Sequence, residues 1–104
     1  MIPKQLKEFM HRVLIETDNG TLLWYEGYQD SYFCESNMFT IHISFGYDEN
    51  QDVYAYIFRI VNGLQVTPFS VVDHEEDYFF MKRLYESVIV SANGIANNIN
   101  DFFG

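Results

Sequence analysis

Residues 53–71, VYAYIFRIVNGLQVTPFSV, constrain the fold of this chain more than any other stretch. Two apolar runs rich in β-branched and aromatic residues flank the dipeptide Asn62-Gly63. This dipeptide is a strong hairpin signal, because a type I′ turn needs positive φ at both of its central residues. We therefore predict two antiparallel strands joined by this dipeptide, with Val61 opposite Leu64.

The two faces of the predicted hairpin differ, because side chains alternate across a strand. In this register Phe58 faces Thr67 and Tyr56 faces Phe69. Pro68 has no N–H to donate to a ladder, so the second strand is expected at a sheet edge or at a bulge. The face predicted to enter the core carries Tyr54, Tyr56, Phe58, Ile60, Phe69 and Val71.

The first part of the chain reads as a helix followed by strands. Residues 3–18 repeat apolar side chains at helical spacing, and Asn19-Gly20 supplies a stop. Residues 21–28 are predicted as a strand with Trp24 in the core. Residues 38–45 alternate as a half-buried strand does. Residues 32–37 leave two alternatives open, a short strand or a loop.

The last part of the chain is predicted to be helical. Asp73 and Glu76 have the spacing of a capping box for a helix over about 74–92. Gly94 is expected to end that helix in the left-handed conformation, leaving a short final helix. The alternative is one long helix that tolerates the glycine.

These elements predict a single α+β domain over residues 1–104. Its sheet is a four-stranded antiparallel meander, with the N-terminal helix and the C-terminal helices packed on one face. The opposite face is left open or is covered by a partner.

Charge and composition limit the function classes. Fifteen acidic residues against six Lys and Arg give a formal net charge of −9. Such a chain is repelled by nucleic acid and by anionic membrane surfaces, so we expect a basic protein partner, no nucleic acid and no membrane. The single cysteine, Cys34, excludes an internal disulfide. With no signal-peptide pattern, this indicates a cytoplasmic protein.

The predicted topology gathers acidic residues. Antiparallel strands alternate in direction, so the turn at 17–20, the loop at 46–52 and the segment 73–77 should lie at one end of the sheet. Two interpretations remain open: solvated loop ends that stabilise a helix N-terminus, or an acidic rim that steers a basic partner. The predicted partner-binding residues, including two aromatic anchors, are Asp18, Tyr47, Asp48, Glu49, Asp52, Asp73, Glu75, Glu76, Asp77 and Tyr78.

No catalytic, cofactor or metal motif is recognisable. Asp48, Asn50 and Asp52 imitate the start of a calcium loop, but Val53 replaces its glycine and Arg59 its final glutamate. The three histidines stand in separate elements, so no zinc spacing exists. There is no nucleophile elbow, P-loop or dinucleotide fingerprint. We therefore expect no enzyme activity, no cofactor and no metal.

The segments TDNGTLLW (17–24) and DYFFMKRLYES (77–87) resemble a pattern of small bacterial and phage proteins of unknown function. In that pattern a T-x-x-G turn precedes a strand with Trp, and D-Y opens a helix with L-Y. The resemblance implies an α+β fold and no activity. It is compatible with toxin-immunity proteins, and it transfers no site residue.

The leading functional hypothesis is a non-enzymatic acidic protein-binding module that neutralises a basic toxin or nuclease. One alternative is a homodimeric structural or chaperone-like protein, joined through the edge strand or the open sheet face. A third is a small-molecule or enzymatic role in a pocket between helices and sheet. The residues proposed for the open face are Met38, Thr40, His42, Ile57 and Val61.

Overall fold

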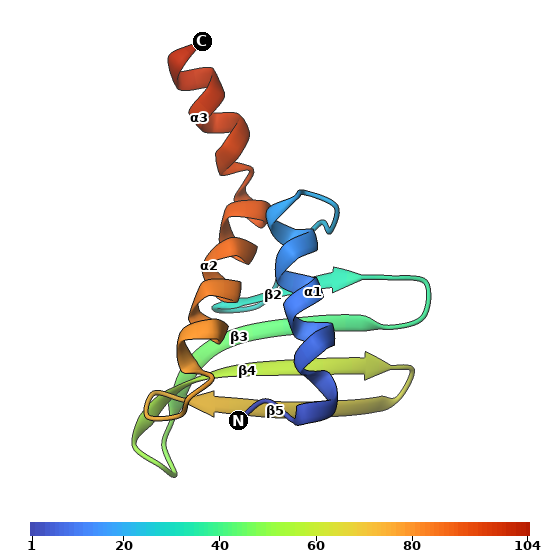
Figure 1. Cartoon of the computed structure of the whole chain (residues 1–104), viewed down its shortest axis with the longest axis vertical. Helices are drawn as coiled ribbons and strands as arrows, with labels where there is room; N and C mark the ends of the chain where they lie inside the picture. Colours follow the sequence, from blue (N-terminus) through green and yellow to red (C-terminus); the bar gives the residue numbers. More distant parts are fainter.

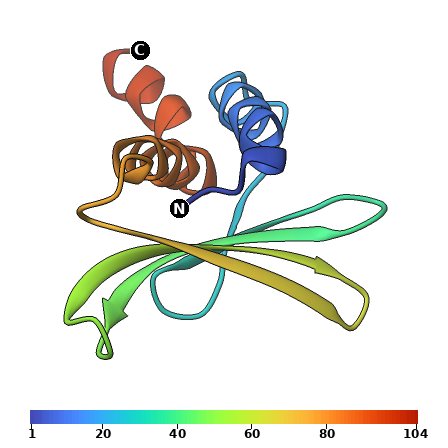
Figure 2. The same ribbon diagram turned by 60° about the horizontal axis from the view of Figure 1, so that its bottom comes forward.

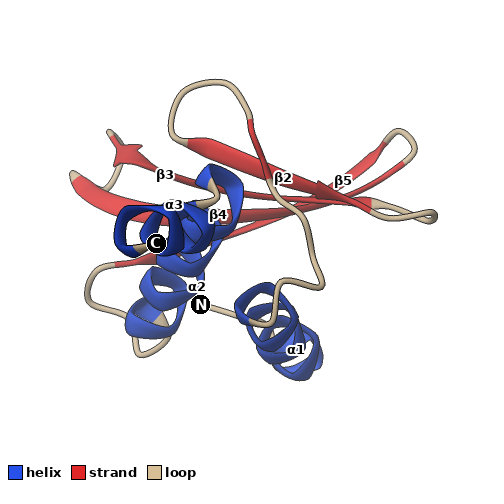
Figure 3. Ribbon diagram, turned by 90° about the horizontal axis from the view of Figure 1, so that it is seen from above, coloured by secondary structure: helices blue, strands red, loops and turns tan.

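A computed structural model describes residues 1–104, the side chain of Ala96 excepted. The chain folds into a helical layer on one face of an antiparallel sheet (Figures 1 and 3), which confirms the predicted α+β class. The sheet order β1-β2-β3-β4-β5 follows the order of the chain. The elements are η1 (Lys4–Leu6), α1 (Lys7–Asp18), β1 (Tyr25–Glu26), β2 (Ser31–Glu35), β3 (Thr40–Asp48), β4 (Val53–Asn62), β5 (Gln65–Val72), α2 (Tyr78–Asn93) and α3 (Ile95–Phe103).

The sheet has five strands, and the prediction of four was wrong. The additional strand is β2, which lies in the stretch that the sequence left ambiguous, and the strand predicted over 21–28 shrinks to the two residues of β1. Trp24 explains the shortening. Its indole is buried and its Nε1 donates a hydrogen bond to Thr17 Oγ1 at 3.0 Å, so residues 21–24 connect the helical layer to the sheet instead of pairing.

The hairpin of β4 and β5 forms, but in a register shifted by two residues from the prediction. Val61 lies opposite Val66, so the two loop residues are Gly63 and Leu64, and Asn62 belongs to β4. Gly63 has a φ of 61°, whereas Asn62 and Leu64 are not among the positive-φ residues. One positive φ at the first central position is the pattern of a type II′ turn, which favours glycine there.

The shift leaves every side chain on its predicted face, because two residues is one full period of a strand. Phe58 and Phe69 now lie directly opposite each other, with ring centroids 5.4 Å apart. The predicted core face therefore packs against the helices, as expected. The fully buried residues that meet there from the sheet, α1 and α2 include Met10, Ile43, Phe58, Val71, Met81, Leu84 and Val88.

The start of α2 differs from the prediction, and its end agrees with it. α2 starts at Tyr78, and the predicted capping box of Asp73 and Glu76 was wrong. The carboxylate of Glu75 closes the turn after β5 instead, accepting a hydrogen bond from the backbone N–H of Val72 at 3.1 Å. Gly94, with a φ of 62°, ends α2 as predicted. α3 leads away from the sheet (Figure 1), so the prediction that both C-terminal helices pack on one sheet face was wrong for α3. In the described part of the chain, no helix has the length and apolarity needed to cross a membrane.

Candidate functional site

The loop between β3 and β4 and the connection from β5 to α2 lie at the same end of the sheet (Figures 1 and 2). This placement follows from the antiparallel meander, in which β3 ends and β5 ends on the same side. The topology thus brings together all the predicted partner-binding residues except Asp18.

Asp18 does not belong to this group, and its predicted position was wrong. Helix α1 crosses the strands (Figure 1), so its last residue lies beside the middle of α2 rather than at the strand ends. There its carboxylate forms an ion pair with Arg83 at 3.1 Å and accepts a hydrogen bond from the hydroxyl of Ser87. Asp18 therefore joins the two helices.

Two of the acids at the strand ends tie the N-terminal segment to the start of α2. The backbone N–H of Ile2 donates to Asp77 Oδ2 at 2.8 Å, and Glu75 Oε2 lies 2.5 Å from the Met1 amine. The hydrogen bond to the N-terminal ammonium is the main cause that lowers the pKa of Glu75 below its usual range. These two carboxylates are engaged within the protein.

Asp48 holds its own loop. Its Oδ1 accepts a hydrogen bond from the Asn50 N–H at 2.9 Å, and its Oδ2 accepts one from Gln51 Nε2 at 3.2 Å. The spacing that imitates a calcium loop is therefore that of an Asx turn. Among the described residues, no group of His, Cys, Asp and Glu side chains could hold a metal ion.

The remaining acids at this end, Glu49, Asp52, Asp73 and Glu76, are exposed. Within ion-pair distance of any of them, the described part of the chain places only the imidazole of His74, whose Nδ1 lies 3.6 Å from Asp73 Oδ1. Four carboxylates thus face solvent at the end of the sheet where the β3–β4 loop and the start of α2 meet. They can act on a partner because they are not occupied in holding the fold.

Exposed aromatic side chains lie beside these carboxylates. Tyr47 is 49% exposed, Tyr54 is 54% exposed and Phe79 is 77% exposed. Ring contacts run from β3 and β4 to α2. Tyr47 and Tyr54 have centroids 5.2 Å apart, and Tyr78 packs on Tyr56 at 5.3 Å and on Phe79 at 5.9 Å. Of the two predicted anchors, Tyr47 is exposed, whereas Tyr78 is partly buried in this series.

We call this surface the acidic–aromatic end. Its exposed carboxylates attract cations, and its aromatic faces can hold an Arg or Lys head group by cation–π contact. Burial raises the pKa of the Tyr56 phenol behind this surface to about 12. The residues of the acidic–aromatic end are Tyr47, Glu49, Asp52, Tyr54, Asp73, Glu76 and Phe79.

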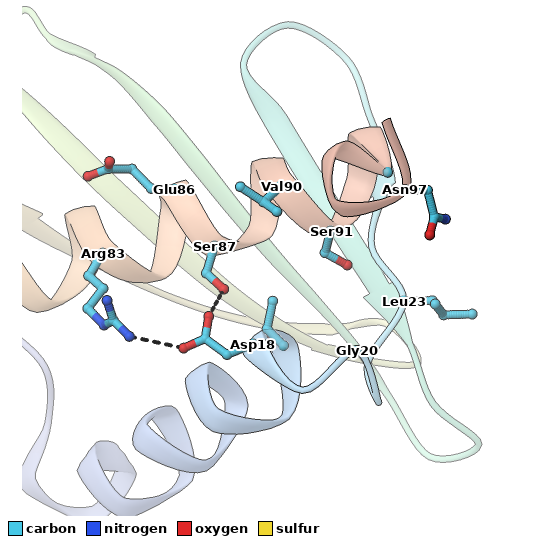
Figure 4. Close-up of a pocket in the computed structure, with 11 residues that line it drawn as sticks. Asp18, Gly20, Leu23, Arg83, Glu86, Ser87, Val90, Ser91 and Asn97 are labelled. Carbon is cyan, nitrogen blue, oxygen red and sulfur yellow. Dashed lines mark hydrogen bonds and ion pairs between the residues drawn. The ribbon is translucent and has the colours of Figure 1, made fainter. Parts of the chain in front are cut away.

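A separate groove of about 610 Å³ runs between the end of α1, α2 and the start of α3 (Figure 4). Several of its polar side chains are bonded within the protein. Asp18 is held by Arg83 and Ser87, and the Ser91 hydroxyl donates to the Leu22 carbonyl at 3.4 Å. These contacts hold α1 against α2, and we assign this groove a structural role.

Comparisons with models of protein families, with curated proteins and with solved structures find no match to this chain. No residue role is therefore transferred from a relative. The resemblance to immunity-type proteins stays a prediction, and function is inferred from the geometry and charge of the chain's own residues.

Proposed function

We propose that this protein is a non-enzymatic binding module that captures a basic protein through its acidic–aromatic end. The observation that carries this proposal is the position of four exposed carboxylates beside three exposed aromatic side chains at one end of the sheet. A purely solvated loop end explains the carboxylates. It does not explain why large aromatic side chains are exposed among them.

The carboxylates supply long-range attraction. A net charge of −9 attracts a cationic protein from a distance, and the local concentration of charge orients it towards this end. Complementary potentials of this kind raise the association rate and fix the orientation of docking more than they raise the final affinity.

The aromatic side chains supply the short-range contact. Tyrosine is enriched among the residues that dominate binding energy, because its ring buries a large area and its hydroxyl can still hydrogen-bond. Tyr47 and Tyr54 contact each other edge-on, with an interplanar angle of 67°, so both present a preorganised surface. Phe79 adds an apolar side chain from the first turn of α2.

Neutralisation of a basic toxin or nuclease is the most concrete form of this proposal. A nuclease binds the phosphates of its substrate with cationic side chains. Carboxylates spread over the β3–β4 loop and the connection from β5 to α2 could occupy such a cationic cleft in place of the substrate. The exposed tyrosines could then stack against its walls.

The test is a pair of triple charge reversals that change the net charge equally. The first variant combines Glu49→Lys, Asp73→Lys and Glu76→Lys, because these acids are exposed and, among the described residues, only Asp73 has a charged or titratable neighbour within ion-pair distance, the adjacent His74. Asp52 is left unchanged because its φ of 57° suits aspartate better than lysine. The control reverses three exposed acids elsewhere on the surface, Glu8, Glu26 and Glu35.

A partner is captured from the host with the wild-type protein, purified, and its association rate is measured by surface plasmon resonance at about 50 and 300 mM salt. We expect the first variant to slow association by tenfold or more and to flatten its salt dependence, with a much smaller effect in the control. Equal effects of the two variants, or a partner that is not basic, would refute the proposal.

A second candidate is a homodimer joined through the sheet face that the helices leave open (Figure 2). Apolar side chains are exposed on or beside this face, including Tyr25 and Val66. Light scattering at increasing protein concentration tests this candidate, and a monomer at every concentration rejects it.

A further inference from the structure

The open face of the sheet carries one row of side chains that crosses all five strands. Tyr25 on β1, Phe33 on β2, His42 on β3, Arg59 on β4 and Pro68 on β5 are each directly opposite the next. The centroids of the Phe33 and His42 rings are 5.9 Å apart. The row places Arg59 on an inner strand, with an uncharged apolar or aromatic neighbour on most sides.

Arg59 is the exception among the basic residues of this acidic protein. Three of the six Lys and Arg residues form ion pairs, and Lys4 and Lys82 are exposed on the helical layer. Arg59 is partly buried, and no carboxylate of the described residues lies within ion-pair distance of it. Its guanidinium donates one long hydrogen bond, from Nη1 to Ser44 Oγ at 3.4 Å. Most of its five N–H donors are therefore available.

A groove of about 470 Å³ opens beside this guanidinium on the same face. Small residues leave the space, since a Cβ built on Gly46 meets no atom of the described residues within 4 Å. The lining of the groove includes the apolar residues Ala55, Ile57 and Pro68, the hydroxyl of Ser70 and the guanidinium of Arg59. Two acids, Asp48 and Glu49, also belong to it.

We propose that this groove binds a carboxylate group carried on an apolar or aromatic body, with Arg59 as its anchor. The planar guanidinium matches a carboxylate through two parallel hydrogen bonds, and the hydroxyls of Ser44 and Ser70 are further donors nearby. Ile57 and Pro68 provide the apolar contact for the body of the ligand.

The charges around the groove favour a singly charged anion over a doubly charged one. Asp48 and Glu49 in its lining repel every anion, and they repel a phosphate dianion more strongly than a carboxylate. His42 beside Arg59 adds no second cation near neutral pH, because burial, followed by the Arg59 charge, lowers its pKa. This site lies on the face away from the helices, and it goes beyond the proposed capture of a basic protein because it recognises an anion.

The carboxylate could belong to a free organic acid or to a peptide chain end, and the test separates the two sources. The probes are 3-phenylpropionate, its neutral amide, inorganic phosphate, and the tripeptide Ala-Ala-Phe with a free or an amidated carboxyl end. Binding is followed by ¹⁵N-edited NMR of the full chain, including the Arg59 Nε–H signal.

We expect saturable shifts at Arg59 and along β3 to β5 with the carboxylates, and at least tenfold weaker binding of the amides and of phosphate. Arg59→Gln should weaken carboxylate binding tenfold or more, whereas the matched control Arg12→Gln should leave it unchanged. Gly46→Val, which keeps Arg59 but fills the groove, should also weaken it.

Tighter binding of the tripeptide assigns the site to a chain end, and tighter binding of 3-phenylpropionate assigns it to a free acid. The proposal is overturned if neither carboxylate gives saturable shifts, if an amide binds as well as its acid, or if Arg59→Gln binds as the wild type does. The comparison of each acid with its amide on the wild-type protein tests the proposed carboxylate site even if a variant fails to fold.

Discussion

Gly63→Ala is expected to destabilise the protein because of backbone conformation alone. Gly63 has a φ of 61° in the two-residue loop between β4 and β5. A Cβ built there meets no atom within 4 Å among the residues that the structure describes, so neither a clash nor a new contact contributes. The substitution therefore isolates the cost of a positive φ in an L-residue.

That cost is roughly 1–2 kcal/mol, and the reduced freedom of the unfolded chain offsets about 0.4–1 kcal/mol of it. We expect a net loss in the free energy of unfolding of about 1 kcal/mol, which lowers the Tm of a domain of this size by roughly 4 °C. Gly46→Ala is the matched control: its Cβ also meets open space, but its φ is not in the left-handed region. It should be neutral or stabilise by about 0.4–1 kcal/mol.

Urea denaturation of both alanine variants and of Asn62→Thr measures these effects. Asn62 lies in β4 opposite Gln65, so threonine there should change stability by less than about 0.5 kcal/mol. If Asn62→Thr loses as much as Gly63→Ala, the turn is the type I′ loop that Asn62-Gly63 suggests from sequence. The observed register would then be wrong.

Three further outcomes can be measured on the purified chain. Thr17→Val leaves the buried Nε1–H of Trp24 without its acceptor and should cost about 1–3 kcal/mol in urea denaturation followed by fluorescence of the single Trp; a loss below about 0.5 kcal/mol contradicts this. The lowered pKa of Glu75 contributes stability that is fully present above its unfolded pKa of about 4.5 and is lost as pH falls through the lowered folded value. Glu75→Gln should therefore reduce the loss of stability at acidic pH. An unchanged pH profile of stability counts against the contact with the Met1 amine. Burial raises the pKa of Tyr56 and of Tyr85 to about 12, so the stability linked to their neutral phenols is lost only as pH rises above 10 towards 12. An absorbance titration of the folded protein in which all tyrosines ionise together near pH 10 contradicts these raised pKa values.

The core was predictable from the sequence although the hairpin register was not. Alternation of side chains assigns Tyr56 and Phe58 to the core face in both registers, because a shift of two residues preserves the faces. The turn type was not predictable from Asn62-Gly63, because one glycine satisfies either a type I′ or a type II′ turn in different frames.

The candidate site was predictable as far as it depends on strand direction. Antiparallel order alone places Glu49 and Glu76 at one end of the sheet. The position of Asp18 depends on how α1 crosses the strands, which no local pattern encodes. Asp77 is occupied by the N–H of Ile2, a contact across 75 residues of sequence that has no periodic signature. Tyr54 lies on the core face but beyond the area that the helices cover.

The order of the sheet also bears on how the chain reaches its folded state. Each strand pairs with its neighbour in sequence, so every pairing closes a short loop at small entropic cost. The helical layer differs, because Asp18 and Arg83 must meet across 65 residues. We therefore expect the strands to associate early and the two helices to dock last, so that α1 completes the burial of the sheet in the late, rate-determining stage.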